Sequence, residues 1–106
     1  MKILIGADKG GYRLKEAIVT HLCEQGIECE DLGTTDLEHP RDFTSIATDV
    51  AGAISAGRAE RAILVCGTGM GMAITANKFK SVRAAVVERQ LSAMYSRKIS
   101  DAYVLC

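Results

Sequence analysis

Short apolar runs alternate with longer segments of helical spacing along the whole chain. The apolar runs cover four to six residues each, at 2–6, 27–32, 62–65, 82–87 and 102–105. Runs of this length and composition are typical of strands buried on both faces of a sheet. The intervening segments repeat apolar residues every three or four positions, which predicts amphipathic helices. These predicted helices cover residues 11–25, 43–55, 72–78 and 90–97.

The pattern of the first predicted helix indicates which of its side chains face the sheet and which face the solvent. Its apolar stripe contains Leu14, Ile18 and Leu22, so we expect these side chains to pack against the sheet. Lys15 and Glu16 fall on the opposite side, where we expect them to face the solvent.

The alternation of strand and helix predicts one α/β domain over residues 1–106. We expect a Rossmann-like, doubly wound parallel sheet of about five strands, joined by right-handed crossovers. With strands numbered in chain order, the common arrangement is 2-1-3-4-5, and ligands then bind beyond the carboxyl ends of strands one and three. Loops 7–11 and 66–71 follow those two strands, so the topology predicts that they meet at one site.

The loop 66–71 places a thiol before a glycine-rich turn. Its glycines leave backbone N–H groups free to converge on an anion, and the nest would comprise Gly67, Gly69, Met70 and Gly71. A thiol beside the amino end of a helix is favoured as thiolate, which makes Cys66 a candidate base or nucleophile. The alternatives are a tight turn that requires glycine, and a cysteine that only packs in the core.

Polar residues near these loops have two interpretations each. Thr68 either donates its hydroxyl to a substrate oxygen or caps the following helix. Asp8 suits a helix cap and can still accept a hydrogen bond from a ligand hydroxyl. Lys9 suits a phosphate or an enediolate, or is a solvated surface lysine. Arg97 and Lys98 either reach a phosphate or complement the carboxyl end of the last helix.

Composition narrows the function classes. The chain has 13 basic and 13 acidic side chains, so no net charge attracts nucleic acid or an anionic membrane. No apolar run approaches the roughly 18 residues of a membrane span. The four cysteines have neither CxxC nor metal-ligand spacing. We therefore expect free thiols, no metal and a cytoplasmic location.

Several motifs in order resemble the family of type B ribose-5-phosphate isomerases and galactose-6-phosphate isomerase subunits. They are GADKGG at 6–11, DLGT at 31–34, CGTGMG at 66–71, ANK at 76–78 and VRAA at 82–85. The resemblance runs over essentially all of the chain. It implies a Rossmann-like sheet and aldose–ketose isomerisation of a phosphorylated sugar without metal or other cofactor. It also implies a homodimer or homotetramer.

The resemblance assigns roles to the loop residues. The family's cysteine that matches Cys66 is a base, which moves a proton between C1 and C2 through an enediolate held by the glycine nest. Thr68 and Asp8 match residues that hold substrate oxygens, and Lys9 stands where the ribose enzymes have histidine. We expect Cys66 and Thr68 to be catalytic, with substrate contacts from Asp8, Lys9, Gly67, Gly69, Met70, Gly71, Arg97 and Ser100.

The sequence departs from the family near its end. Ile99 and Ser100 replace a His-Asn pair whose histidine the family assigns to opening the sugar ring. We expect a pentose, hexose or tetrose phosphate as substrate, and a short open-chain sugar such as a tetrose phosphate would need no ring opening. Family members continue for several tens of residues beyond the position of Cys106, through helices that carry phosphate-binding arginines. We therefore expect an apolar face near strand five and self-association. The alternative function is a non-catalytic sugar-phosphate-binding or partner subunit of a hetero-oligomer.

Overall fold

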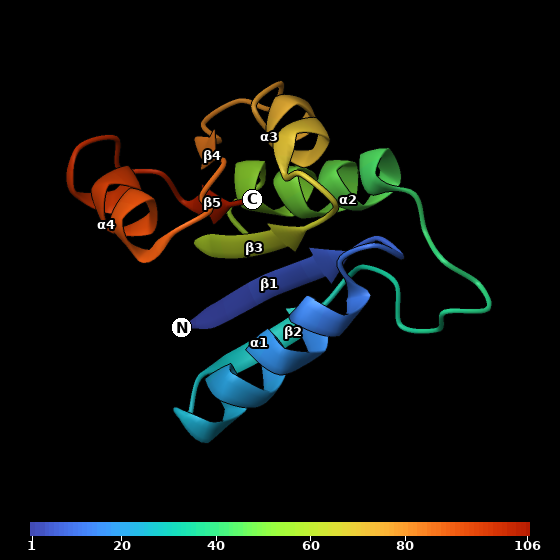
Figure 1. Cartoon of the computed structure of the whole chain (residues 1–106). Helices are drawn as coiled ribbons and strands as arrows, with labels where there is room; N and C mark the ends of the chain where they lie inside the picture. The colour runs from blue at the N-terminus through green and yellow to red at the C-terminus, as the bar shows by residue number, and fades with distance from the viewer.

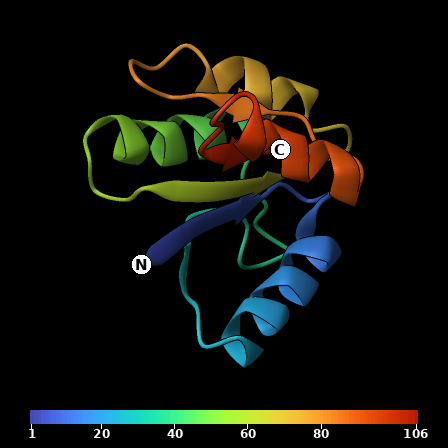
Figure 2. The ribbon, with the colours of Figure 1, turned by 90° about the vertical axis from the view of Figure 1, so that its left-hand side faces the viewer.

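Parallel pairing joins five strands into one sheet in a computed structural model that describes residues 1–106 (Figure 1). The strands are β1 (Lys2–Ala7), β2 (Glu28–Asp31), β3 (Arg61–Val65), β4 (Ala84–Ala85) and β5 (Val104–Leu105). The helices are α1 (Tyr12–Glu24), α2 (Phe43–Ser55), α3 (Met70–Ala76) and α4 (Gln90–Lys98). Helices α2 and α3 lie on one side of the sheet and α1 on the other, as Figure 2 also shows. The predicted α/β fold class is confirmed.

The predicted order of the last two strands is wrong. The sheet runs β2-β1-β3-β5-β4, so β5 enters between β3 and β4. Val104 of β5 is fully buried, whereas Ala84 and Ala85 of β4 are only half-buried. The bulkier apolar strand therefore takes the inner position, and the short alanine pair forms the edge. The reversal of strand order between β1 and β3 is as predicted.

Helix α2 supplies most of the core on its side of the sheet. Ile46, Val50 and Ile54 form its buried stripe, and they pack with Leu4 of β1 and Leu64 of β3. Asp42 starts the helix, because its side chain accepts a hydrogen bond from the Ser45 amide at 2.9 Å. The prediction for this helix is therefore confirmed at both ends.

Helix α1 faces the sheet differently from its predicted orientation. Lys15 is only 1% exposed, whereas Leu14 is 59% exposed. The ammonium of Lys15 lies 2.7 Å from Asp31 of β2 and 2.7 Å from Glu16, so its charge is paired inside the protein. Leu14 and Ile18 instead line an open groove beside β3. The expectation that Lys15 faces solvent is wrong, because Asp31 provides a partner from another element.

None of the four helices combines the length and the apolar character that crossing a lipid bilayer requires.

Candidate active site

The loops that follow β1 and β3 touch at the carboxyl edge of the sheet. The amide of Asp8 donates to the carbonyl of Val65 at 3.2 Å. A Cβ atom on Gly11 would lie 2.4 Å from that same carbonyl oxygen, so only glycine allows this approach. A Cβ on Gly10 would lie 3.9 Å from the amide nitrogen of Gly67. The juxtaposition expected from the topology is present.

Cys66 stands directly after β3 and lines a groove of about 690 Å³. The thiol is half-buried, and its Sγ accepts a hydrogen bond from the Gly69 amide at 3.1 Å. Gly69 has a φ of +77°, and a Cβ there would lie 2.8 Å from the carbonyl carbon of Cys106. Glycine is therefore required at this position both by the backbone conformation and by space. The turn thus aims one backbone donor at the sulfur.

Only some of the backbone amides in the predicted anion-binding nest lack a hydrogen-bond partner within the chain. The amides of Gly67, Thr68 and Gly71 donate to no acceptor within the chain, whereas Gly69 donates to Cys66 and Met70 donates to the Thr68 hydroxyl oxygen at 3.2 Å. Thr68 thus closes a local turn onto Met70, whereas the N-cap residue of α3 is Gly69, which has no side chain to cap it. Three unpaired amides beside the thiol leave donors for an oxyanion, and Gly67 and Thr68 are exposed.

Asp8 both shapes its loop and keeps an acceptor open. Its Oδ1 accepts from the Gly11 amide at 3.0 Å, whereas Oδ2 has no partner in the chain. No buried side-chain polar atom lacks a partner, so Oδ2 is open to solvent or a ligand. The neighbouring Lys9 is exposed and forms no ion pair. The loop therefore offers one oriented carboxylate oxygen and one free cation.

Cys106 belongs to this edge, although its sequence context suggested no role. Its thiol lines the same groove as Cys66. Burial, with a smaller contribution from the charge of Cys66, raises the pKa of Cys106 to about 12. Cys106 therefore remains a thiol at neutral pH, and Cys66 is the better candidate base of the two. Its position directly after β5, at the carboxyl edge, is the signal that could have indicated this placement.

Phe43 was also missed as a neighbour of the glycine turn. A Cβ on Gly71 would lie 2.5 Å from the Phe43 ring, so the ring packs closely against that backbone. The side chain is still 41% exposed. Phe43 thereby gives the turn an aromatic wall that remains accessible.

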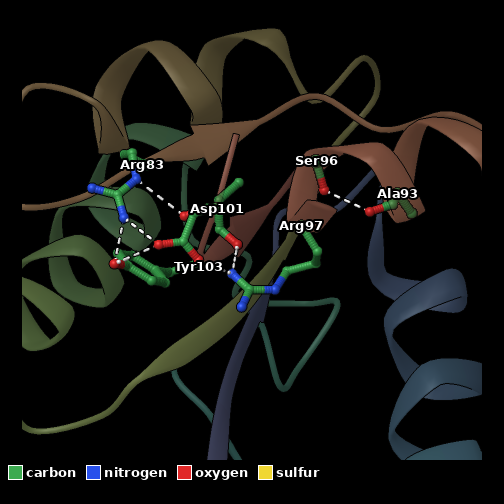
Figure 3. A network of polar contacts seen from close by, with 7 residues as sticks. Arg83, Ala93, Ser96, Arg97, Asp101 and Tyr103 are labelled. Carbon is green, nitrogen blue, oxygen red and sulfur yellow. Dashed lines mark hydrogen bonds and ion pairs between the residues drawn. The ribbon is translucent and has the colours of Figure 1, made fainter. Parts of the chain in front are cut away.

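Arg97 and Ser100 do not join this group within one chain. Arg97 donates to Asp101 at 3.0 Å and to the Ala102 carbonyl at 2.7 Å, at the amino end of β5 (Figure 3). Ser100 is exposed in the same turn. The strands are parallel, so residues that precede β5 lie at the edge opposite to Cys66. Within one chain these two residues therefore lie away from Cys66, and their expected contacts with substrate stay a prediction.

The same opposite edge holds a connected polar network (Figure 3). Arg83 donates to Asp101 Oδ2 at 2.8 Å and to the hydroxyl of Tyr103. The Arg83 guanidinium also stacks over the Tyr103 ring, with its carbon 4.4 Å from the ring centroid. These contacts occupy both arginines, and they tie the turn before β5 to the strand that follows α3.

Known proteins are similar to this chain in the sequence and the fold that carry this geometry. The model of the Ribose/Galactose Isomerase family matches residues 3–106. The chain belongs to this family. A 4-deoxy-4-sulfo-D-erythrose isomerase from Clostridium sp. (strain MSTE9) is 50% identical over 105 residues, which are 99% of this chain and 66% of that protein. Ribose-5-P isomerase B from Listeria innocua is 45% identical over 105 residues, 99% of this chain and 70% of that protein.

A solved structure agrees with the fold. Ribose-5-Phosphate Isomerase B from Clostridium thermocellum superposes with a TM-score of 0.93 at 43% identity, covering 99% of this chain and 70% of that one. The chain thus spans from 66% to 70% of the length of these family members.

Proposed function

We propose that the chain is the catalytic domain of an aldose–ketose isomerase that acts on a phosphorylated sugar. The observation that carries the proposal is the Cys66 thiol, which opens on a groove beside unpaired backbone amides in a member of a sugar isomerase family. A base and oxyanion donors at one point are what an enediolate reaction requires.

The reaction follows from these groups. Cys66 as thiolate removes the proton from C2 of the aldose, and the electron pair moves toward the C1 oxygen, which gives an enediolate. The free amides of Gly67 and Gly71 stabilise the negative oxygen. The same sulfur, whose proton exchanges with solvent, then delivers a proton to C1, while the O2 proton moves to O1 and the C2 carbonyl of the ketose forms. Asp8 accepts from a substrate hydroxyl, and the exposed Lys9 attracts the anionic group.

Within this class we favour a four-carbon substrate. Ile99, which cannot exchange a proton, stands at the position that the family resemblance associates with ring opening. A tetrose substituted at C4 has no free hydroxyl that can close a five-membered ring, so it needs no ring opening. The 50% identical relative is named for such a sugar, 4-deoxy-4-sulfo-D-erythrose.

Solvent-deuterium incorporation at C2 tests the proposal, followed by NMR with a tetrose 4-phosphate, ribose 5-phosphate and a sulfonated tetrose. We expect incorporation with the unmodified chain, fastest for a tetrose, and none with Cys66→Ala. Cys23→Ala is the matched control, because Cys23 is an exposed cysteine on α1. No incorporation in the unmodified chain, or equal incorporation after Cys66→Ala, contradicts the proposal.

A second candidate is a non-catalytic sugar-phosphate-binding or partner subunit. It is favoured by the engagement of Arg97 with Asp101, which leaves Lys9 as the cation that the two site loops contribute. Binding of a sugar phosphate without deuterium incorporation, with turnover restored by an added homologous chain, distinguishes this candidate.

We also propose that the chain forms a homodimer or homotetramer and that it acts in the cytoplasm. The groove beside Cys66 is lined mainly by apolar side chains, among them Leu14, Ile18, Ile63 and Leu105. Exposed apolar surface of this kind favours self-association. Sedimentation equilibrium tests it, and a monomer at micromolar concentration contradicts it.

A further inference from the structure

Lys15 and Asp31 form an ion pair that sits behind the Asp8 loop. The Lys15 ammonium lies 2.7 Å from Asp31 Oδ2, and the side chain is 2% exposed. Burial opposes the charge on Lys15, but hydrogen bonds and ion pairs with Asp31 and Glu16 outweigh it, so the pKa of this lysine is raised. Lys15 therefore carries its charge at neutral pH.

The second oxygen of Asp31 extends this link to β1. Asp31 Oδ1 accepts from the Gly33 amide at 2.9 Å. Gly33 lies so close to β1 that a Cβ there would be 2.3 Å from the Ala7 nitrogen. The next amide, that of Thr34, donates to the Ala7 carbonyl at 2.8 Å. One carboxylate thus connects α1 with Ala7, the residue immediately before Asp8.

The other end of the loop is tied to the same lysine. The backbone amide of Lys15 donates to the Gly11 carbonyl at 2.9 Å, and the Gly11 amide donates to both the carbonyl and the side chain of Asp8. The segment 8–10 is therefore held between Ala7 and Gly11. The Lys15–Asp31 pair joins these two anchors.

Stability alone accounts poorly for such a pair. Replacing a buried ion pair by apolar residues of similar volume is often neutral or stabilising, because desolvation offsets the attraction. Glu30 and Lys2 form a second pair between β1 and β2, but it is exposed and remote from the loop. It provides a matched comparison.

We propose that Lys15 and Asp31 are positioning residues that fix the position of the Asp8 carboxylate relative to Cys66. They act through the anchors of the loop and do not touch the substrate. The catalytic consequence rests on the proposed function, whereas the structural consequence does not. A displacement of about 1 Å in such a group can cost about 100-fold in rate.

The test uses the double variant Lys15→Met/Asp31→Asn, with Lys2→Met as control. Asparagine keeps an acceptor for the Gly33 amide, and removing both charges leaves no unpaired buried ion. We expect the amides of Asp8 and Gly11 to exchange hydrogen about 10-fold faster than in the unmodified chain, while the amides of α2 are unchanged. Lys2→Met leaves all of them unchanged. Unaltered exchange at Asp8 and Gly11 overturns the inference, whether or not the chain is active.

Kinetics separates positioning from general loosening. We expect kcat in the double variant to fall about 10-fold with KM within about twofold, because proton transfer is more sensitive to geometry than anchoring of the anionic group is. In an Asp8→Ala background the same two substitutions should have no further effect on kcat, since they act through Asp8. An additive loss in that background overturns the inference. Loss of isomerisation in the unmodified chain instead contradicts the proposed function.

Discussion

The polar groups at the two edges of the sheet differ in whether they have hydrogen-bond partners within the chain. At the amino edge, Asp101 uses both carboxylate oxygens, and Arg83 and Arg97 both donate to it. At the carboxyl edge, the amides of Gly67 and Gly71 and one oxygen of Asp8 have no partner in the chain.

Groups that are satisfied within the fold contribute to structure, whereas groups that are left open can be satisfied by a ligand. The difference predicts which edge tolerates substitution. Changes to the open groups at the carboxyl edge should alter chemistry, and changes at the amino edge should alter only stability.

The largest expected effect is at Cys66. Cys66→Ser keeps a small polar side chain but replaces the thiol by a far weaker acid, so we expect kcat to fall by about 10²- to 10⁴-fold, the range for loss of a general base. Steady-state kinetics with a tetrose phosphate measures it. Cys106→Ala is the control in the same groove, and we expect kcat to stay within about twofold because that thiol remains protonated. Comparable losses in both variants would contradict the assignment of the base.

The second largest expected effect distinguishes the strain of a left-handed backbone at a glycine from a steric clash of the added side chain. Gly57 and Gly69 share a φ of +77°, but a Cβ on Gly57 would have no atom within 4 Å, whereas one on Gly69 would meet Cys106 at 2.8 Å. Gly57→Ala therefore measures left-handed strain alone, about 1 kcal/mol in the free energy of unfolding, with kcat unchanged.

Gly69→Ala adds the clash and displaces the amide that donates to the Cys66 sulfur. We expect a larger loss of stability than for Gly57→Ala, with kcat reduced about 10-fold or more. Urea denaturation and steady-state kinetics measure the two quantities. Equal behaviour of the two variants would show that the turn is only a bend in the chain.

Prediction from sequence worked where local signals agreed. The apolar stripe of Ile46, Val50 and Ile54 predicted α2 with the bounds that the structure has. The site loops could be placed together because parallel strands bring their carboxyl ends to one edge. Two strands of two residues each gave no comparable signal, so their order could not be read. That order depends on how well each run fills the interior, which is a tertiary property.

Lys15 shows why other features of the structure could not be predicted from the sequence. Helical periodicity places a lysine outside, and only a carboxylate from β2 reverses that placement. Arg97 shows the converse. The sequence leaves Arg97 either to reach a phosphate or to complement the carboxyl end of the last helix, and in the structure Asp101 engages it at the amino edge. For Lys15 a partner on another element decides the role of the charge, and for Arg97 a partner four residues further along the chain does so.

The smallest expected effect tests the amino edge by pH. Burial opposes the charge of Asp101, but the Tyr103 hydroxyl and the charges of Arg97 and Arg83 outweigh it, so the pKa of this carboxyl lies below its ordinary value of 3.8. A carboxyl with a depressed pKa contributes stability above its unfolded pKa, and the contribution is lost as pH falls through the folded value.

Asp101→Asn should therefore lower the melting temperature slightly at pH 7, and this difference from the unmodified chain should disappear as pH falls below about 3.8. Thermal denaturation across that interval measures it. Because the network lies at the edge opposite to Cys66, kcat at pH 7 should not change. A fall in kcat at pH 7 without loss of fold would contradict the division between the two edges. It would mean that the turn before β5 reaches an active site, which in this geometry must be that of a neighbouring copy.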